Sequence, residues 1–205
     1  MLLLSRWLDA VPAFVDAHVR SGHSAPTIGF VPTASAIYPD HAWVDLDRTT
    51  LRGFGYPVID IPLDTLPADE VTARIDDVDA LFVSGGNVFH LLYVLRSTGL
   101  DIALAERIRA GLPYLGASAG ACIVGPDIAP LHLLDDPAET APLDSTLGLG
   151  IIDVVPVPHA DGKVGGTAAV DELRRRYSST HDLRFLDDDQ ALEVIGTTIR
   201  TVRSG

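Results

Sequence analysis

The stretch GLPYLGASAGACIVG, residues 111–125, decides how the rest of the chain is interpreted. It places Ser118 in a Gly-x-Ser-x-Gly pattern, after the apolar run PYLG and before a run of small and apolar residues. This pattern is typical of a sharp turn from a strand into a helix, where glycines leave room for a crowded backbone. It is also typical of any tight turn built from small residues. The spacing therefore leaves two interpretations open, a presented nucleophile and a packing turn.

The segments before this turn alternate between strand patterns and helix patterns. Apolar runs that predict strands occupy residues 27–32, 57–63, 80–86 and 113–117, and apolar residues at helical spacing predict helices over 44–55, 68–75, 87–99 and 102–111. This order predicts a mostly parallel, doubly wound α/β sheet with helices on both faces. Unbroken apolar runs fit strands that are buried on both sides. We also expect a short buried strand in the opening MLLL.

The pattern changes beyond residue 125. Residues 127–145 are rich in Asp and Pro, and they predict a long loop that acts as a lid over a site. A strand over 150–159, a helix over 168–178 and two or three short strands within 183–202 are expected to follow. Because no repeat or linker interrupts the chain, we expect residues 1–205 to form a single domain.

The composition is that of an acidic globular protein. Of the 205 residues, 47% are apolar, and 28 Asp and Glu against 15 Lys and Arg give a net charge of −13. Nucleic-acid binding usually requires a basic surface, so we expect no nucleic-acid partner. The basic cluster of Arg174, Arg175 and Arg176 stands beside Asp171 and Glu172 in a helical pattern. It predicts a solvated helix face.

The chain shows no sign of a membrane segment or of a disulfide framework. No apolar run reaches the roughly 18 residues of a membrane span, and the opening MLLLSRWLDA is too short for the apolar part of a signal peptide. The single cysteine, Cys122, excludes an internal disulfide and a multi-cysteine metal site. We therefore expect a cytoplasmic protein that needs no metal or cofactor.

A second strand end carries glycines like those around Ser118. The run ALFVSGG, residues 80–86, ends in Gly85 and Gly86 just before a predicted helix. In doubly wound sheets, sites gather at the carboxyl ends of the strands. The amides of Gly86 and Ala119 are therefore candidates for an oxyanion hole. The alternative is that these glycines only allow a helix to pack closely on its strand.

Ser118 needs a base and the base needs a carboxylate. His159 follows the run VVPVP at a predicted strand end, and His132 in the long loop is its main competitor. Three aspartates in FLDDDQAL and three in the loop after the turn are candidates for the acid. They are Asp187, Asp188 and Asp189 in the first group and Asp127, Asp135 and Asp136 in the second.

Taken together, these motifs resemble the peptidase E family, the aspartyl dipeptidase group of serine peptidases. The resemblance rests on LFVSGGNVFHLLYVL, GLPYLGASAGACIVGPDI and DDDQALEV, in that order, and covers the chain from about residue 27 to its end. It implies a three-layer αβα fold similar to that of class I glutamine amidotransferases. In those relatives the nucleophile is a Cys, whereas here it would be Ser118.

The resemblance also implies roles for individual residues. Ser118 would be the nucleophile and His159 the general base, and the family's acid, often a Glu, falls on Asp188. Gly86 and Ala119 would supply the oxyanion amides, with Asn87 shaping the substrate site. Cys122 is expected to be a small buried helix residue.

The resemblance to the peptidase E family also bears on substrate preference. Family members that cut Asp-X dipeptides look to use an Arg after the catalytic His to pair with the substrate's Asp. Here Lys163 is the only cation before Arg174 in that segment, and we expect it, with Asn87, to bind the substrate. We expect a metal-independent serine dipeptidase that acts on short peptides, Asp-X among them, through an acyl-enzyme. The alternatives are a cyanophycinase-like amide hydrolase and a non-catalytic binding domain of the same fold.

Overall fold

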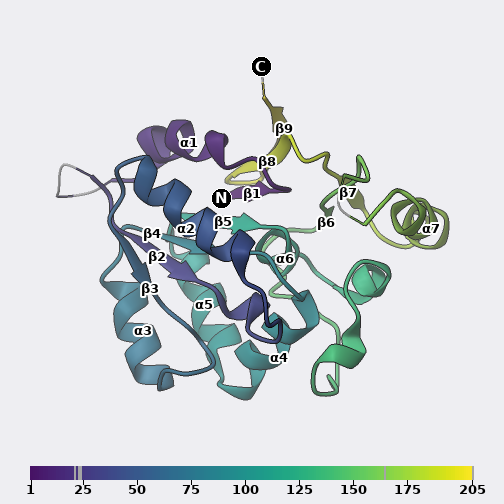
Figure 1. Cartoon of the computed structure of the whole chain (residues 1–205), viewed down its shortest axis with the longest axis horizontal. Coiled ribbons are helices and arrows are strands. Elements are labelled where there is room, and N and C mark those ends of the chain that lie inside the picture. Colours follow the sequence, from purple (N-terminus) through teal and green to yellow (C-terminus); the bar gives the residue numbers. More distant parts are fainter. Residues whose placement is uncertain (21, 23–24, 164, 205) are drawn as a thin grey trace.

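The computed structural model describes residues 1–20, 22, 25–163 and 165–204 around a seven-stranded sheet (Figure 1). The order of its strands is β3-β2-β4-β5-β1-β8-β9. Their bounds are β1 (Leu2–Leu4), β2 (Ile28–Val31), β3 (Val58–Asp60), β4 (Ala80–Val83), β5 (Tyr114–Ala117), β8 (Gln190–Ile195) and β9 (Thr198–Arg203). Strands β1 to β5 are parallel, whereas β8 pairs antiparallel with both β1 and β9.

Helices cover both faces of this sheet. Figure 1 shows α1 (Val11–His18) and α2 (Ala42–Gly53) on one side, and α3 (Ala68–Asp76), α4 (Val88–Ser97) and α5 (Leu100–Arg109) on the other. Alternate strand residues serve the two layers: Leu2 and Leu4 belong to the core under α1 and α2, and Leu3 belongs to the opposite core. The predicted mostly parallel, three-layer αβα architecture is confirmed.

The turn from β5 into α6 (Ala119–Cys122) is formed by direct contact between backbones. A Cβ on Gly120 would lie 2.1 Å from the Val83 carbonyl oxygen, and one on Gly116 would lie 2.3 Å from the Gly120 carbonyl oxygen. Only glycine fits at either position. The predicted strand–turn–helix is therefore present, with a helix of only four residues.

The prediction of a strand over residues 150–159 was wrong in its length and in its sheet. Only β6 (Val155–Val157) is extended, and it pairs with β7 (Leu183–Phe185) in a separate two-stranded sheet. The preceding residues bend because their amides bind the turn after α6: Leu149 N donates to Ile123 O, and Ile151 N donates to Val124 O. Helix α7 (Ala168–Tyr177) connects the two strands, and its three arginines are exposed, as predicted.

The long segment 127–145 contains two short 3₁₀ helices, η3 (Ala129–Leu133) and η4 (Pro137–Glu139). Two more 3₁₀ turns, η1 (Leu8–Ala10) and η2 (Thr33–Ser35), follow β1 and β2. The segment is fastened to the start of α4, because Val88 N donates to Asp135 Oδ2 and His90 Nδ1 lies 3.2 Å from Thr140 Oγ1. It forms a fixed wall rather than an unstructured loop.

Within the described residues, no single helix is both long enough and apolar enough to cross a membrane. Helices α4 and α5 together pass a test of length and composition, but the pair is bent by 102° at its junction.

Replacing Gly120 with Ala tests the backbone contact at the turn. The added methyl group must displace the Val83 carbonyl, and we expect Gly120→Ala to lower the free energy of unfolding by about 3 kcal/mol in urea denaturation. Gly53→Ala is the matched control, since its Cβ meets nothing within 4 Å at the end of α2. That substitution should be neutral or stabilise by up to about 1 kcal/mol. Equal stability of the two variants would contradict the proposed constraint.

Candidate active site

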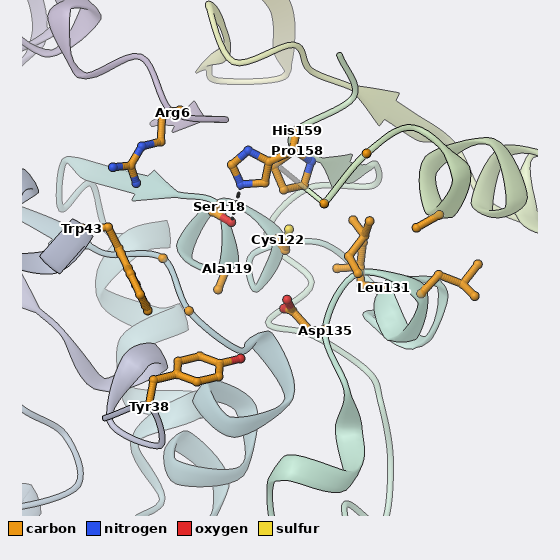
Figure 2. A pocket seen from close by; sticks show the side chains of 17 residues that line it. Arg6, Tyr38, Trp43, Ser118, Ala119, Cys122, Leu131, Asp135, Pro158 and His159 are labelled. Carbon is orange, nitrogen blue, oxygen red and sulfur yellow. Dashed lines mark hydrogen bonds between the residues drawn. The ribbon is translucent and has the colours of Figure 1, made fainter. Parts of the chain in front are cut away.

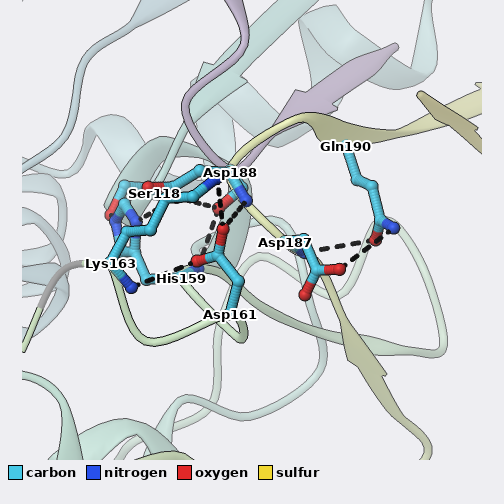
Figure 3. A network of polar contacts seen from close by, with 8 residues as sticks. Ser118, His159, Asp161, Lys163, Asp187, Asp188 and Gln190 are labelled. Carbon is cyan, nitrogen blue, oxygen red and sulfur yellow. Dashed lines mark hydrogen bonds and ion pairs between the residues drawn. The ribbon is translucent and has the colours of Figure 1, made fainter. Parts of the chain in front are cut away.

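Three segments far apart in the sequence meet at the carboxyl edge of the main sheet (Figure 3). Ser118 Oγ lies 3.2 Å from His159 Nε2, and His159 Nδ1 lies 2.6 Å from Asp188 Oδ1. The side chains of His159 and Asp188 are 16% and 14% exposed, so their contact is largely shielded from water. The structure thus brings together the serine, the histidine and one of the three candidate aspartates of FLDDDQAL.

Ser118 and His159 both have unusual backbone conformations. Ser118 has φ 49° and ψ −110°, and His159 has φ 59°. Positive φ is uncommon for residues other than glycine, and it is found most often at functional sites. At Ser118 the conformation is held by a hydrogen bond from its amide to Leu4 O (3.0 Å) and by the glycine contacts of the turn.

Ser5 connects the histidine to the aspartate, and the sequence analysis missed it. Its hydroxyl donates to Asp188 Oδ1 (3.0 Å) and accepts a hydrogen bond from the His159 amide (2.8 Å). Ser5 is fully buried directly after β1, which lies beside β5 in the sheet. The signal was available, because a polar residue after a buried parallel strand lies at the same edge as Ser118.

A cavity of about 600 Å³ opens in front of Ser118 (Figure 2). Its lining combines the turn at Ser118, the glycines after β4, the loop after α6 and the aromatic side chains of Tyr38 and Trp43. The lining residues include Arg6, Tyr38, Trp43, Gly85, Gly86, Ser118, Ala119, Cys122, Leu131, Asp135, His159 and Gly166. Such a mostly apolar hollow with a few polar groups is typical of a small-ligand site.

Two sets of backbone amides face the cavity beside Ser118. Among the described residues, neither the Gly85 amide nor the Gly86 amide finds an acceptor. The Ala119 amide is the first of helix α6, where no intrahelical acceptor exists. A Cβ on Gly85 would lie 3.2 Å from Ser118 Cβ, which shows how closely the two turns approach. The predicted pair Gly86 and Ala119 thus lines the same cavity as Ser118, and neither amide has an acceptor among the described residues.

Asn87 and Lys163 lie elsewhere than expected for substrate-binding residues. The Asn87 side chain is fully buried and caps α4, accepting from the amides of Phe89 and His90. Its Nδ2 donates to the loop at Asp136 O and Glu139 Oε2. Asn87 therefore shapes the cavity indirectly, by fixing its wall.

Lys163 is not part of the cavity lining. Its side chain is 66% exposed, and its Nζ pairs with Asp161 Oδ2 at 2.9 Å, a contact that raises the pKa of Lys163. Asp161 Oδ2 also accepts from the Asp188 amide at 3.3 Å (Figure 3). Lys163 therefore contacts Asp188 indirectly, through Asp161, and is not part of the cavity lining.

The other candidates for base and acid have different partners. His132 Nδ1 contacts Ala129 O and the ring packs on Tyr177. Asp127 lies 3.5 Å from His181, Asp136 caps η4, Asp187 contacts Gln190, and Asp189 is exposed. Of the loop aspartates, Asp135 alone lines the cavity.

Cys122 is a buried helix residue, as predicted. It is 3% exposed, its Sγ contacts Pro156 O at 3.4 Å, and burial raises the pKa of the thiol. A thiol that resists ionisation is a poor nucleophile.

Comparison with known proteins identifies the family. The model of peptidase family S51 matches residues 6–202. The chain belongs to peptidase family S51. It is 33% identical over 199 residues to an uncharacterized peptidase of Listeria innocua, and the match covers 94% of each chain. It is 39% identical to peptidase E of Streptomyces coelicolor over 132 residues, which cover 62% of this chain and 53% of that protein.

A solved structure gives the same family relationship. The crystal structure of a candidate peptidase E protein from Listeria monocytogenes matches with a TM-score of 0.85 and 28% identity, and the match covers 100% of this chain and 98% of that one. The resemblance to the peptidase E family seen in the sequence is confirmed.

Two carboxyl groups with raised pKa values, the buried Asp47 and the half-buried Asp135, stand out near the site of this S51 family member. Burial raises the pKa of Asp135 to about 6, an effect that the hydrogen bond from the Val88 amide opposes and the nearby Glu139 charge reinforces. Burial likewise raises the pKa of Asp47 to about 6, opposed by the charge of Arg6 and the hydrogen bond from Ser84. Both groups are ionised at neutral pH at a cost in stability.

Asp135→Asn tests this cost through its pH dependence. A carboxyl group whose pKa rises from 3.8 to about 6 on folding binds more protons in the native state, so its contribution to stability falls as pH rises through about 4 to 6. We expect the variant to be more stable than wild type by about 1–3 kcal/mol at pH 7.5 and by much less at pH 4 in urea denaturation. Asp136→Asn, which removes an exposed charge beside it, should show no such pH-dependent gain. A gain for Asp135→Asn that does not change with pH would contradict the assignment.

Proposed function

We propose that this protein is a serine peptidase of short peptides, with Ser118 as nucleophile, His159 as general base and Asp188 as the carboxylate that orients the histidine. The observation that carries the proposal is the continuous contact from Ser118 Oγ through the His159 ring to Asp188 Oδ1. A hydroxyl, an imidazole and a carboxylate in this order are the groups that serine hydrolysis requires.

The chemistry follows from the different partners of the two ring nitrogens of His159. Because Nδ1 contacts a carboxylate, it carries the proton in the neutral ring, and Nε2 is free to accept the Ser118 proton. Ser118 Oγ then attacks the peptide carbonyl carbon, and protonated Nε2 gives its proton to the departing amine as the C–N bond breaks. Water, deprotonated in the same way, hydrolyses the resulting ester and restores Ser118.

The tetrahedral intermediate carries a negative charge on its oxygen. The amides of Gly86 and Ala119, both in the cavity lining beside Ser118, are the proposed donors to that oxygen. Donors of this kind contribute about 3 kcal/mol each to transition-state stabilisation. Because these are backbone groups held by the glycine contacts of the turn, they need little reorganisation during the reaction.

The size of the cavity favours short peptides as substrates. Its volume of about 600 Å³ is that of a small-ligand site. Leu131 and Asp135 form one wall, and the loop that carries them is fastened to α4 through Asn87 and Val88. A folded protein substrate would have to displace this wall, whereas a dipeptide would not.

Ser118→Ala is the direct test. Wild type should react covalently with a fluorophosphonate probe and hydrolyse members of a dipeptide panel, whereas Ser118→Ala should not be labelled and should lose at least about 1000-fold in kcat/KM. Mass spectrometry of the labelled peptide would locate the adduct. Unchanged hydrolysis by the variant, or a wild-type serine that stays silent toward the probe and the panel, would refute the proposal.

Asp188→Asn tests the identity of the acid. An amide preserves the shape but favours the wrong tautomer of His159, and we expect kcat to fall by about 100- to 10,000-fold with little change in KM. Asp189→Asn removes the charge of the exposed neighbour and should retain most of the activity. A larger loss for Asp189→Asn than for Asp188→Asn would move the acid to the other residue.

A further inference from the structure

The cavity contains one permanent positive charge, and it comes from a residue that the sequence analysis did not consider. Of the described residues that line it, Arg6 is the only Lys or Arg. Lys163, the expected substrate-binding cation, is paired with Asp161 outside the lining. Arg6, in contrast, makes no ion pair or hydrogen bond through its side chain to any described residue. A partly buried guanidinium without a partner can bind an anion.

The fold places this guanidinium beside the proposed nucleophile. Arg6 follows Ser5 at the end of β1, and Ser5 contacts both His159 and Asp188. Figure 2 shows Arg6 near Trp43 on one side of Ser118 and Asp135 on the other side. The cavity is therefore positive at one end and negative at the other, with the reactive hydroxyl between them.

Asp47 lies behind Arg6 and does not neutralise it by direct pairing. Asp47 is 2% exposed, and the hydrogen bond it accepts comes from Ser84 Oγ at 3.0 Å. The charge of Arg6 nevertheless acts on Asp47, since it favours the ionised carboxylate against the effect of burial. Because no hydrogen bond or ion pair joins Arg6 to Asp47, the guanidinium N–H groups remain available.

We propose that Arg6 binds a carboxylate of the peptide substrate. The inference rests on the proposed peptidase function and names the residue that selects its substrates. A guanidinium binds a carboxylate through two parallel N–H···O bonds, which gives both affinity and orientation. The carboxylate has two possible sources in a short peptide, its C-terminus or an acidic side chain, and the chemistry at Arg6 is the same for both.

The overall charge of the protein does not itself attract a carboxylate. At a net charge of −13, the molecule repels an anionic ligand at long range. Asp135 on the opposite side of the cavity excludes a carboxylate from that end and favours an ammonium group there. A free peptide carries both charges, so Arg6 and Asp135 together define one orientation across Ser118.

Binding in the Ser118→Ala background tests the inference without turnover. Isothermal titration with Ala-Leu against Ala-Leu-amide isolates the terminal carboxylate, and Asp-Leu-amide against Asn-Leu-amide isolates the acidic side chain. We expect the carboxylate member of one pair to bind about 10- to 100-fold more tightly than its neutral partner. The pair that shows the preference identifies the source of the carboxylate.

Arg6→Gln in the same background should abolish that preference and leave the affinity for the neutral peptides nearly unchanged. Arg6→Lys, which keeps the charge but not the two parallel bonds, should retain only part of it. Arg52→Gln is the matched control, because it removes an exposed arginine of α2 and changes the net charge equally. This control should keep the full preference.

The outcomes separate this inference from the proposed function. If Arg6→Gln and Arg6→Lys both keep the full carboxylate preference, or if neither pair shows a preference, the role of Arg6 is refuted even where wild type hydrolyses peptides. If the preference depends on Arg6 but wild type neither hydrolyses the panel nor reacts with the fluorophosphonate, the carboxylate site stands and the peptidase proposal fails.

Discussion

The structure of the site depends on one close contact between two stretches of backbone. At the start of α6, Gly120 lies so near the Val83 carbonyl of β4 that a Cβ there would be 2.1 Å from its oxygen. This contact lets α6 pack directly on the sheet with no side chain between them, and the turn that precedes α6 places Ser118 at φ 49°. The serine hydroxyl lies at the edge of the sheet, 3.2 Å from His159 Nε2. The packing turn that Gly-x-Ser-x-Gly allows is therefore present, and the same turn brings the serine to His159.

Contacts between distant parts of the sequence complete the arrangement. Ser5 and Asp188 are 183 positions apart, and Ser5 and His159 are 154 apart. β1 lies between β5 and β8, so the residues that follow β1 and β5 and those that precede β8 meet at one edge. The central place of β1 in the sheet explains why a serine near the start of the chain supports groups near its end.

The sequence could predict what is determined locally. Gly116, Ser118 and Gly120 form a complete turn motif, and Gly85 and Gly86 likewise stand between a strand and a helix. Both turns could therefore be recognised from the sequence alone. His159 was found because it follows a strand, although that strand lies in the second sheet rather than the main one. Asp188 could be named only through the family resemblance, because three adjacent aspartates look alike until a histidine contacts one of them.

What the sequence could not predict depends on tertiary placement. Asn87 was expected at the substrate, but its position before α4 makes it a helix cap, as its residue type favours. Lys163 was expected to bind substrate, but it forms an ion pair with Asp161, two residues earlier in the chain. Arg6 was overlooked although, like Ser5, it follows the strand expected in MLLL; that this strand lies beside β5 is seen only in the tertiary structure.

Asp47 and Asp135 explain how the turn after β4 is held. Asp47 accepts a hydrogen bond from Ser84, and Asp135 accepts one from the Val88 amide, so the two groups fix both ends of the turn that contains Gly85 and Gly86. Each is ionised at neutral pH against a pKa of about 6, which costs stability. Such a loss of stability can be tolerated where it fixes hydrogen-bond donors in place before a reaction. A backbone amide that is already in position stabilises a developing oxyanion without having to move. The strained serine and the two destabilising aspartates thus serve the same end, which is to hold hydroxyl and amides in one fixed relation at the edge of the sheet.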